Sequence, residues 1–222
     1  MTATLSDTTL YYEVFGAGTP LLLLHGNGED HTIFTELCRE LSHDFTVYAI
    51  DSRGHGKSSP AREFHYTDMA EDIAQFIDAL KIDCPIVYGF SDGGIIALLL
   101  AVKHPDKVSK LVVSGVNASP SGLKCLSHLS FFFTYLKRRD PLVKLLLREP
   151  NITAEMLGQI KAPTLVLAGS RDLIRSRHTK WIASSIPNAE LLILPNETHS
   201  SYVIQSIKLA PILKEYIRNQ RG

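Results

Sequence analysis

The chain has 222 residues, of which 45% are hydrophobic and 21% are charged, as expected for one globular domain with a sizeable core. Its 23 Lys and Arg residues balance 23 Asp and Glu residues, so the formal net charge is zero. Because a balanced charge offers no general attraction for phosphate groups, we expect neither nucleic acid nor a membrane as a partner. Three cysteines without a CxxC pair argue against a disulfide framework or a zinc site.

The N-terminal residues resemble no targeting segment. Residues 1–10 contain neither the basic nor the apolar stretch of a secretory signal. The longest apolar run, residues 95–102, is far shorter than the about 20 residues that cross a bilayer. We therefore expect no transmembrane helix and a cytoplasmic protein.

Short apolar runs alternate with helical patterns along the chain. Residues 8–15 alternate in polarity and end at Gly16 and Gly18, which predicts an antiparallel edge strand or hairpin. Buried parallel strands are then predicted over 20–25, 45–51, 85–89, 110–114, 163–169 and 191–195. Amphipathic spacing predicts helices between them, as in 67–80, and a last helix over 204–217. The alternation indicates an α/β fold with a mostly parallel central sheet.

One segment departs from this alternation. Residues 119–158 are helical in character, mainly over 126–136 and 142–147, and contain no further strand pattern. We interpret them as a small helical cap, or lid, inserted within a single domain of residues 1–222. We find no internal repeat in the sequence.

The most informative motif surrounds Ser91. Residues 89–93 read Gly-Phe-Ser-Asp-Gly, a GxSxG pattern that follows a predicted strand and precedes the apolar helix at 95–102. In this context the pattern is a nucleophile elbow, a tight turn that exposes the serine hydroxyl. Glycines on both sides let the strand and helix approach closely. Ser91 is therefore our candidate nucleophile, with an ordinary helix-capping serine as the alternative.

A serine hydroxyl needs a general base and a group that orients this base. Asp172 comes soon after the predicted strand 163–169, and His199 follows the strand 191–195. Both therefore lie near the carboxyl ends of strands, where ligands meet an α/β sheet. The chain order Ser, Asp, His is that of α/β-hydrolases. We predict Ser91, Asp172 and His199 as a catalytic triad.

With these motifs the chain resembles the α/β-hydrolase superfamily, in its serine-nucleophile, esterase-like branch, over nearly its whole length. Residues 25–28, His-Gly-Asn-Gly, resemble the family's loop after the first parallel strand, and residues 51–58 resemble its D-x-R-G-x-G-x-S loop. The resemblance implies a three-layer fold with a short helical cap. It also implies an oxyanion hole formed by the backbone N–H groups of Asn27 and Asp92.

The expected activity is hydrolysis of a small-molecule carboxylic ester, or a related acyl bond, through an acyl-enzyme intermediate. The same triad in this family also supports amide hydrolysis and C–C bond hydrolysis, and a non-catalytic receptor for a small ligand is the alternative of another class. Phe131, Phe132 and Tyr135 of the cap are candidates for lining the substrate pocket, with simple packing as the alternative. His25 and His55 suit structural hydrogen bonding, and we predict no metal and no nucleotide cofactor.

Overall fold

The computed structural model describes residues 1–219 and contains one eight-stranded sheet with the strand order β1-β2-β4-β3-β5-β6-β7-β8. β1 pairs with β2, and β2 with β4, in antiparallel register, whereas the remaining neighbours are parallel. The predicted mostly parallel sheet with an antiparallel N-terminal edge is thereby confirmed. The strands are β1 (Thr2–Thr4), β2 (Thr9–Phe15), β3 (Thr19–Leu24), β4 (Phe45–Ile50), β5 (Ile86–Phe90), β6 (Lys110–Ser114), β7 (Thr164–Gly169) and β8 (Ala189–Leu194).

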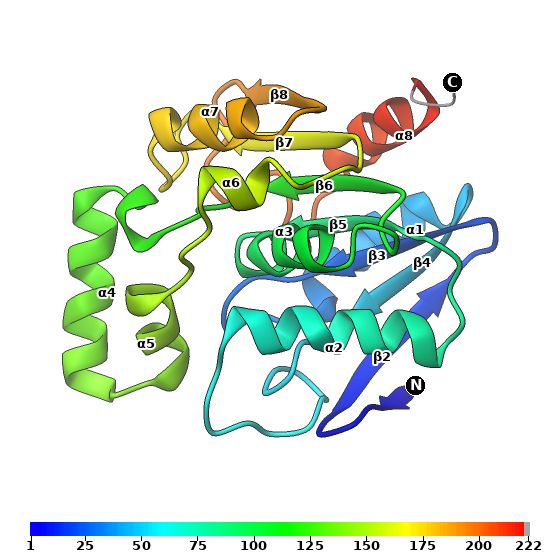
Figure 1. Cartoon of the computed structure of the whole chain (residues 1–222), viewed down its shortest axis with the longest axis horizontal. Helices are drawn as coiled ribbons and strands as arrows, with labels where there is room; N and C mark the ends of the chain where they lie inside the picture. The colour runs from blue at the N-terminus through cyan, green and yellow to red at the C-terminus, as the bar shows by residue number, and fades with distance from the viewer. Residues whose placement is uncertain (220–222) are drawn as a thin grey trace.

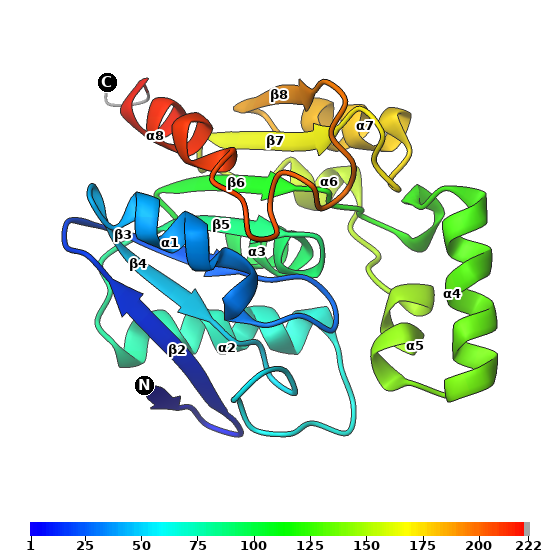
Figure 2. The same ribbon diagram turned by 180° about the vertical axis from the view of Figure 1, so that it is seen from behind.

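Helices cover both faces of the sheet. The helices α2 (Tyr66–Ala79), α3 (Asp92–Lys103), α6 (Ala154–Leu157) and α7 (Ser176–Ser185) lie on the face seen in Figure 1. The 3-10 helix η1 (His31–Phe34), α1 (Thr35–Leu41) and α8 (Leu209–Asn219) lie on the opposite face, seen in Figure 2. Three layers result.

The leucines of β3 show how the sequence forms two cores. Leu22 and Leu24 belong to the apolar cluster that includes α2 and α3, whereas Leu21 and Leu23 belong to the cluster that includes α1 and α8. Successive side chains of a strand point to opposite faces, so a strand covered on both sides needs an unbroken apolar run. All four leucines are fully buried.

The last helix is shorter than the sequence pattern indicates. It was predicted over 204–217, but α8 begins at Leu209 and residues 201–205 form turns. Pro211 gives the physical reason: it has no N–H for an intrahelical bond, and its ring would clash with the carbonyl of residue 207. Proline is therefore tolerated in the first turn of α8 but would interrupt a helix that began at residue 204.

Residues 120–148 lie within the segment 119–158 that was interpreted as a cap, and they form three helices. We call residues 120–148 the cap, because α6 of the same segment lies on the face of the sheet. The 3-10 helix η2 (Pro120–Gly122) leads into α4 (Cys125–Arg138), which is joined by a short turn to α5 (Pro141–Arg148). Arg139 adopts the left-handed conformation that ends α4, and the carboxylate of Asp140 accepts a hydrogen bond from Leu142 N–H at 2.8 Å to start α5. The two helices pack against each other and project from the body of the molecule (Figure 1).

Within residues 1–219, no helix combines the length and hydropathy that a bilayer crossing requires.

Candidate active site

Ser91 lies in the sharp turn between β5 and α3. Its backbone has φ 53° and ψ −115°, a strained conformation for a residue with a side chain. The turn is held by two backbone bonds: Ser91 N–H donates to the carbonyl of Ser114 on β6 at 2.9 Å, and Gly94 N–H donates to the carbonyl of Ser91 at 2.9 Å. These bonds hold Ser91 in its strained conformation, and its hydroxyl lies beyond the carboxyl end of β5.

The flanking glycines permit this turn. A Cβ atom on Gly89 would lie 2.2 Å from the carbonyl oxygen of Gly93, and one on Gly93 would lie 2.1 Å from that of Leu24 on β3. Both distances are far below any real contact, and in each case the obstacle is backbone. The two glycines of the GxSxG pattern are therefore required for β5, α3 and β3 to approach each other this closely.

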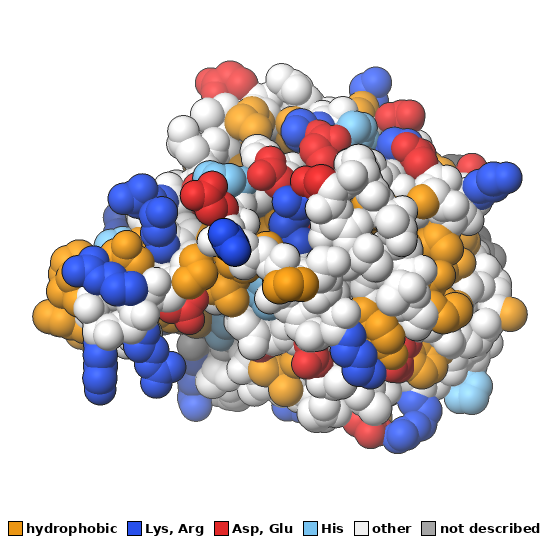
Figure 3. All heavy atoms as spheres, turned by 90° about the horizontal axis from the view of Figure 1, so that it is seen from below, with side chains coloured by type: hydrophobic (Ala, Val, Ile, Leu, Met, Phe, Trp, Pro, Cys, Tyr) orange, Lys and Arg blue, Asp and Glu red, His pale blue; other side chains and the backbone are white. Residues whose placement is uncertain are grey.

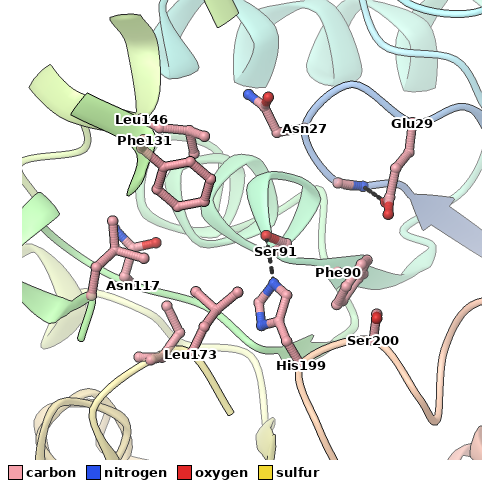
Figure 4. Close-up of a pocket in the computed structure, with 13 residues that line it drawn as sticks. Asn27, Glu29, Phe90, Ser91, Asn117, Phe131, Leu146, Leu173, His199 and Ser200 are labelled. Carbon is pink, nitrogen blue, oxygen red and sulfur yellow. Dashed lines mark hydrogen bonds between the residues drawn. The ribbon is translucent and has the colours of Figure 1, made fainter. Parts of the chain in front are cut away.

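His199 and Asp172 meet Ser91 at the carboxyl end of the sheet. The Nε2 atom of His199 lies 3.1 Å from Ser91 Oγ, and its Nδ1 atom lies 2.8 Å from Asp172 Oδ1. Asp172 is buried and its Oδ1 atom also accepts the N–H of Ile174 at 2.9 Å, which fixes the carboxylate. Figure 4 shows the imidazole pointing at the serine hydroxyl. The structure thus brings together three residues that are 81 and 27 positions apart in the sequence.

Gly115, directly after β6, makes room for the histidine ring. Its φ is +61°, and a Cβ atom there would lie 2.7 Å from Cε1 and 2.9 Å from Nδ1 of His199. Phe90 contacts the ring from another side, with ring centroids 5.1 Å apart. No sequence motif marks Gly115, because its importance comes from a contact with a residue 84 positions later.

A cavity of about 210 Å³ opens beside Ser91. Phe131 of α4 and Leu146 of α5 form one wall of it (Figure 4). The prediction that Phe132 and Tyr135 also line the pocket is wrong, because neither is among the lining residues. Neighbouring residues of a helix point about 100° apart, so Phe132 faces away when Phe131 faces in. The Tyr135 ring lies one turn further along α4, beside the guanidinium group of Arg139 at 5.4 Å.

Asn27 and Asp92 adjoin the serine. The Asn27 side-chain amide donates to Asp92 Oδ2 at 2.8 Å and to the carbonyl of Leu142, at the start of α5, at 3.3 Å. Burial raises the pKa of Asp92, and the hydrogen bond from Asn27 opposes that shift. Among the residues that the structure describes, the backbone N–H groups of Asn27 and Asp92 have no protein acceptor. Both are therefore available to a ligand.

Glu29 is a pocket residue that the sequence analysis missed. Its Oε2 atom accepts the N–H of Gly26 at 3.0 Å (Figure 4). Burial raises the pKa of this carboxyl, while the bond from Gly26 and the nearby His199 oppose the shift. No motif marked Glu29, because its role depends on the fold of the loop after β3. The carboxylate holds that loop from the side next to the cavity.

His25 and His55 also hold this loop. His25 Nε2 accepts the N–H of Ser52 at 3.0 Å, and His55 Nε2 accepts the N–H of Gly28 at 3.1 Å. Burial lowers the pKa of His25 to about 4, with the neighbouring His55 as a second cause. Both imidazoles thus accept hydrogen bonds from backbone N–H groups, which is the structural use predicted for them.

One group of possible metal ligands lies nearby. Atoms of Asp30, His31 and Asp51 lie within 4.8 Å of one another. However, Asp51 Oδ1 already lies 2.7 Å from both the backbone N and Nδ1 of His31, and its Oδ2 accepts the N–H of Lys57 at 2.9 Å. Since these bonds account for the arrangement, we assign no ion to it.

Comparison with known proteins identifies the family of this fold. The sequence model of a family described as the alpha/beta hydrolase fold matches residues 19–149, more than half of the chain. The chain belongs to the alpha/beta hydrolase fold family. The match covers the loop after β3, the nucleophile elbow and the cap helices α4 and α5, whereas Asp172 and His199 lie beyond it.

Sequence similarity to individual relatives covers nearly the whole chain. A serine hydrolase of Mus musculus named BPHL is 27% identical, over 94% of this chain and 83% of its own. A pimeloyl-[acyl-carrier protein] methyl ester esterase of Chromobacterium violaceum is 25% identical, over 95% of this chain and 99% of its own. The solved structure of a thermophilic esterase from Thermogutta terrifontis has a TM-score of 0.82 at 22% identity, covering 99% of this chain and 98% of that one, which establishes likeness of fold.

Proposed function

We propose that this chain is a serine hydrolase that cleaves small-molecule carboxylic esters through an acyl-enzyme on Ser91. The observation that carries the proposal is the continuous chain of contacts from Ser91 Oγ to His199 Nε2 (3.1 Å) and from His199 Nδ1 to Asp172 Oδ1 (2.8 Å). The names of the relatives, a serine hydrolase and a methyl ester esterase, agree with ester hydrolysis.

The proton transfers follow from this geometry. Asp172 accepts a hydrogen bond from Nδ1–H, so the unprotonated Nε2 of His199 faces the serine hydroxyl. As Ser91 Oγ attacks the ester carbonyl carbon, Nε2 takes the hydroxyl proton and then returns it to the departing alkoxide. Water, activated in the same way by His199, next attacks acyl-Ser91 and releases the carboxylic acid. The buried Asp172 carboxylate stabilises the imidazolium in both steps.

The tetrahedral intermediates carry a negative oxygen that needs hydrogen-bond donors. We assign this role to the backbone N–H groups of Asn27 and Asp92. Donors positioned in this way contribute about 2.7–4 kcal/mol each, because they face a charge that develops in the transition state. Asp92 N–H lies in the first turn of α3, whose N-terminal end carries partial positive charge. Glu29, His25 and His55 are positioning residues that keep the loop with Asn27 in place.

The cavity limits the acyl group. Its volume of about 210 Å³ lies below the roughly 300–1,000 Å³ of pockets that enclose drug-sized ligands. Its walls include Leu123, Phe131, Leu146 and Leu173, which suit an uncharged acyl chain. We therefore expect short-chain esters to react faster than long-chain esters.

Fluorophosphonate labelling with peptide mapping tests the nucleophile. Wild-type protein should be labelled on Ser91, and Ser91→Ala and His199→Ala should remain unlabelled. Ser200→Ala is a matched control, since Ser200 lines the same cavity and the described residues give its hydroxyl no histidine partner; it should still be labelled. Hydrolysis of p-nitrophenyl esters from acetate to octanoate should decline with chain length.

Two outcomes would contradict the proposal. If wild-type protein is neither labelled nor active on any ester, a receptor for a small ligand on the same fold becomes the better explanation. If labelling persists in Ser91→Ala, the nucleophile lies elsewhere.

A further inference from the structure

The outer face of α4 is an apolar surface that no other described residue of the chain covers. No residue of α4 is buried, and five of its large apolar side chains are exposed by 43% to 82%. Eleven large apolar side chains of the described residues are exposed by at least 37%, and five of them lie on this one helix of 14 residues. We call these five residues the α4 stripe: Leu126, Leu129, Phe132, Phe133 and Leu136.

The α4 stripe is one continuous face. With about 100° between successive helical residues, its five members fall within an arc of about 120°. Phe131 lies outside this arc and faces the cavity together with Leu146. The cap thus has two apolar sides, one lining the candidate active site and one facing solvent. An exposed apolar surface of this kind marks an interaction site more often than chance exposure.

Cations are concentrated in the segment that carries the α4 stripe. Residues 124–148 contain six of the 23 Lys and Arg residues but only one of the 23 Asp and Glu residues, Asp140. Residues 124–148 therefore carry a net charge of +5, and the remainder of the chain carries −5. The six cations are exposed, and within the described part of the chain none forms an ion pair: Lys124, Lys137, Arg138, Arg139, Lys144 and Arg148.

Figure 3 shows this arrangement, with hydrophobic side chains gathered at the projecting end that holds α4 and α5 and basic side chains beside them. Glu149, the next acidic residue, turns to the body of the molecule, where it accepts hydrogen bonds from His65 Nδ1 and Tyr66 N–H. The zero net charge of the whole chain hides this separation. Total charge therefore does not exclude a membrane partner for the cap.

We infer that the α4 stripe and its cations bind the surface of a membrane that contains anionic phospholipids. Large apolar side chains on one face of a helix and Lys or Arg beside them are the features of helices that lie in the membrane interface. The apolar side chains would enter the boundary between headgroups and acyl chains, while the cations meet phosphate groups. Peripheral binding of this kind requires no transmembrane helix.

Two other occupants fit less well. A symmetric contact between two copies through the stripe would bring two caps of charge +5 together, which like-charge repulsion opposes. A nucleic acid would satisfy the cations but leave the apolar stripe in contact with its polar backbone. An anionic lipid surface satisfies both the stripe and its cations.

Vesicle co-sedimentation tests the inference with the full-length protein. One set of vesicles contains phosphatidylcholine alone, and the other contains phosphatidylcholine with phosphatidylglycerol. Wild-type protein should sediment with the anionic vesicles and remain largely in solution with the neutral ones. Raising the salt concentration should release it, because screening weakens the contribution of the cations.

Two double variants separate the contributions. Leu129→Ser with Phe133→Ser should remove most of the binding. Lys137→Glu with Arg138→Glu should weaken it at least about tenfold, since each cation near an anionic surface contributes about fivefold in affinity.

Each variant has a matched control. Leu191→Ser with Leu192→Ser removes two side chains on β8 that are 39% and 38% exposed, and Lys161→Glu with Lys180→Glu makes the same charge change at two exposed cations outside the cap. Both controls should bind like wild type. Thermal unfolding shows that each variant is folded, and labelling of Ser91 reports on the nucleophile separately, so failure of one proposal leaves the other testable.

Several outcomes would overturn the inference. Wild-type protein that stays in solution with anionic vesicles refutes it, as does equal binding to neutral and anionic vesicles. Equal losses in the cap variants and their controls would show that binding is not specific to the α4 stripe. If light scattering shows a dimer that only the Leu129 and Phe133 substitutions dissociate, a second copy covers the stripe instead.

Discussion

Gly115→Ala tests how the position of the His199 ring is set. The added Cβ would lie 2.7 Å from His199 Cε1, whereas ordinary contact begins at about 3.4 Å. The ring must therefore move by several tenths of an ångström or the backbone after β6 must shift. A residue with a side chain at φ +61° also costs about 1–2 kcal/mol of stability. The substitution thus combines a modest loss of stability with displacement of His199, the proposed general base.

The effect on activity should exceed the effect on stability. Displacement of a catalytic group by about 1 Å can lower the rate about 100-fold, so we expect kcat/KM to fall by about that factor. KM should change little, because residue 115 is not among the residues that line the cavity. Ester hydrolysis and the rate of fluorophosphonate labelling measure the first effect, and urea denaturation measures the second.

Gly28→Ala is the matched control for stability. Gly28 has φ +69°, close to that of Gly115, but nothing lies within 4 Å of an added Cβ there. Both variants should therefore lose a similar amount from backbone strain, and any additional loss in Gly115→Ala measures the contact with His199. Activity of Gly115→Ala within about threefold of wild type would refute the argument that this glycine sets the position of the ring.

Three further predictions concern the same site. Asp172→Asn should lower kcat about 10⁴-fold at pH 7 with little change in fold, because the amide no longer selects the imidazole tautomer whose unprotonated Nε2 faces Ser91. Steady-state kinetics measure this effect, and a loss below tenfold would exclude Asp172 as the orienting group. Burial lowers the pKa of His25 to about 4, so between about pH 6.5 and 4 the unfolded chain binds a proton that the folded chain does not. The free energy of unfolding should therefore fall by up to about 3 kcal/mol as the pH decreases through this window. Urea denaturation should show a smaller fall in His25→Gln, whereas the exposed control His43→Gln should show the same fall as wild type. Asn27→Ala should lower the free energy of unfolding, measured by urea denaturation, by about 1–3 kcal/mol, because it removes the amide that donates to the buried Asp92 carboxylate at 2.8 Å. The same substitution in an Asp92→Asn background should cost less; additive losses would show that the two side chains are not coupled.

The local sequence determined much of this protein. Apolar runs of strand length indicated the parallel sheet, because a strand covered on both faces needs an unbroken run such as residues 21–24. The glycines around Ser91 indicated the elbow, since the turn depends on residues within four positions of each other. Asp172 and His199 could be predicted as its partners because parallel strands end at the same edge of a sheet.

Tertiary structure decided what depends on residues distant in sequence. Gly115 matters because His199 lies against it, and Glu29 because the loop after β3 turns its carboxylate toward Gly26. The pattern of α4 indicated a helix but not which of its two apolar sides faces the cavity. In the structure Phe131 lines the cavity and Phe132 does not. The pairing of α4 with α5 leaves one apolar side in solvent, a property of packing that periodicity alone does not contain.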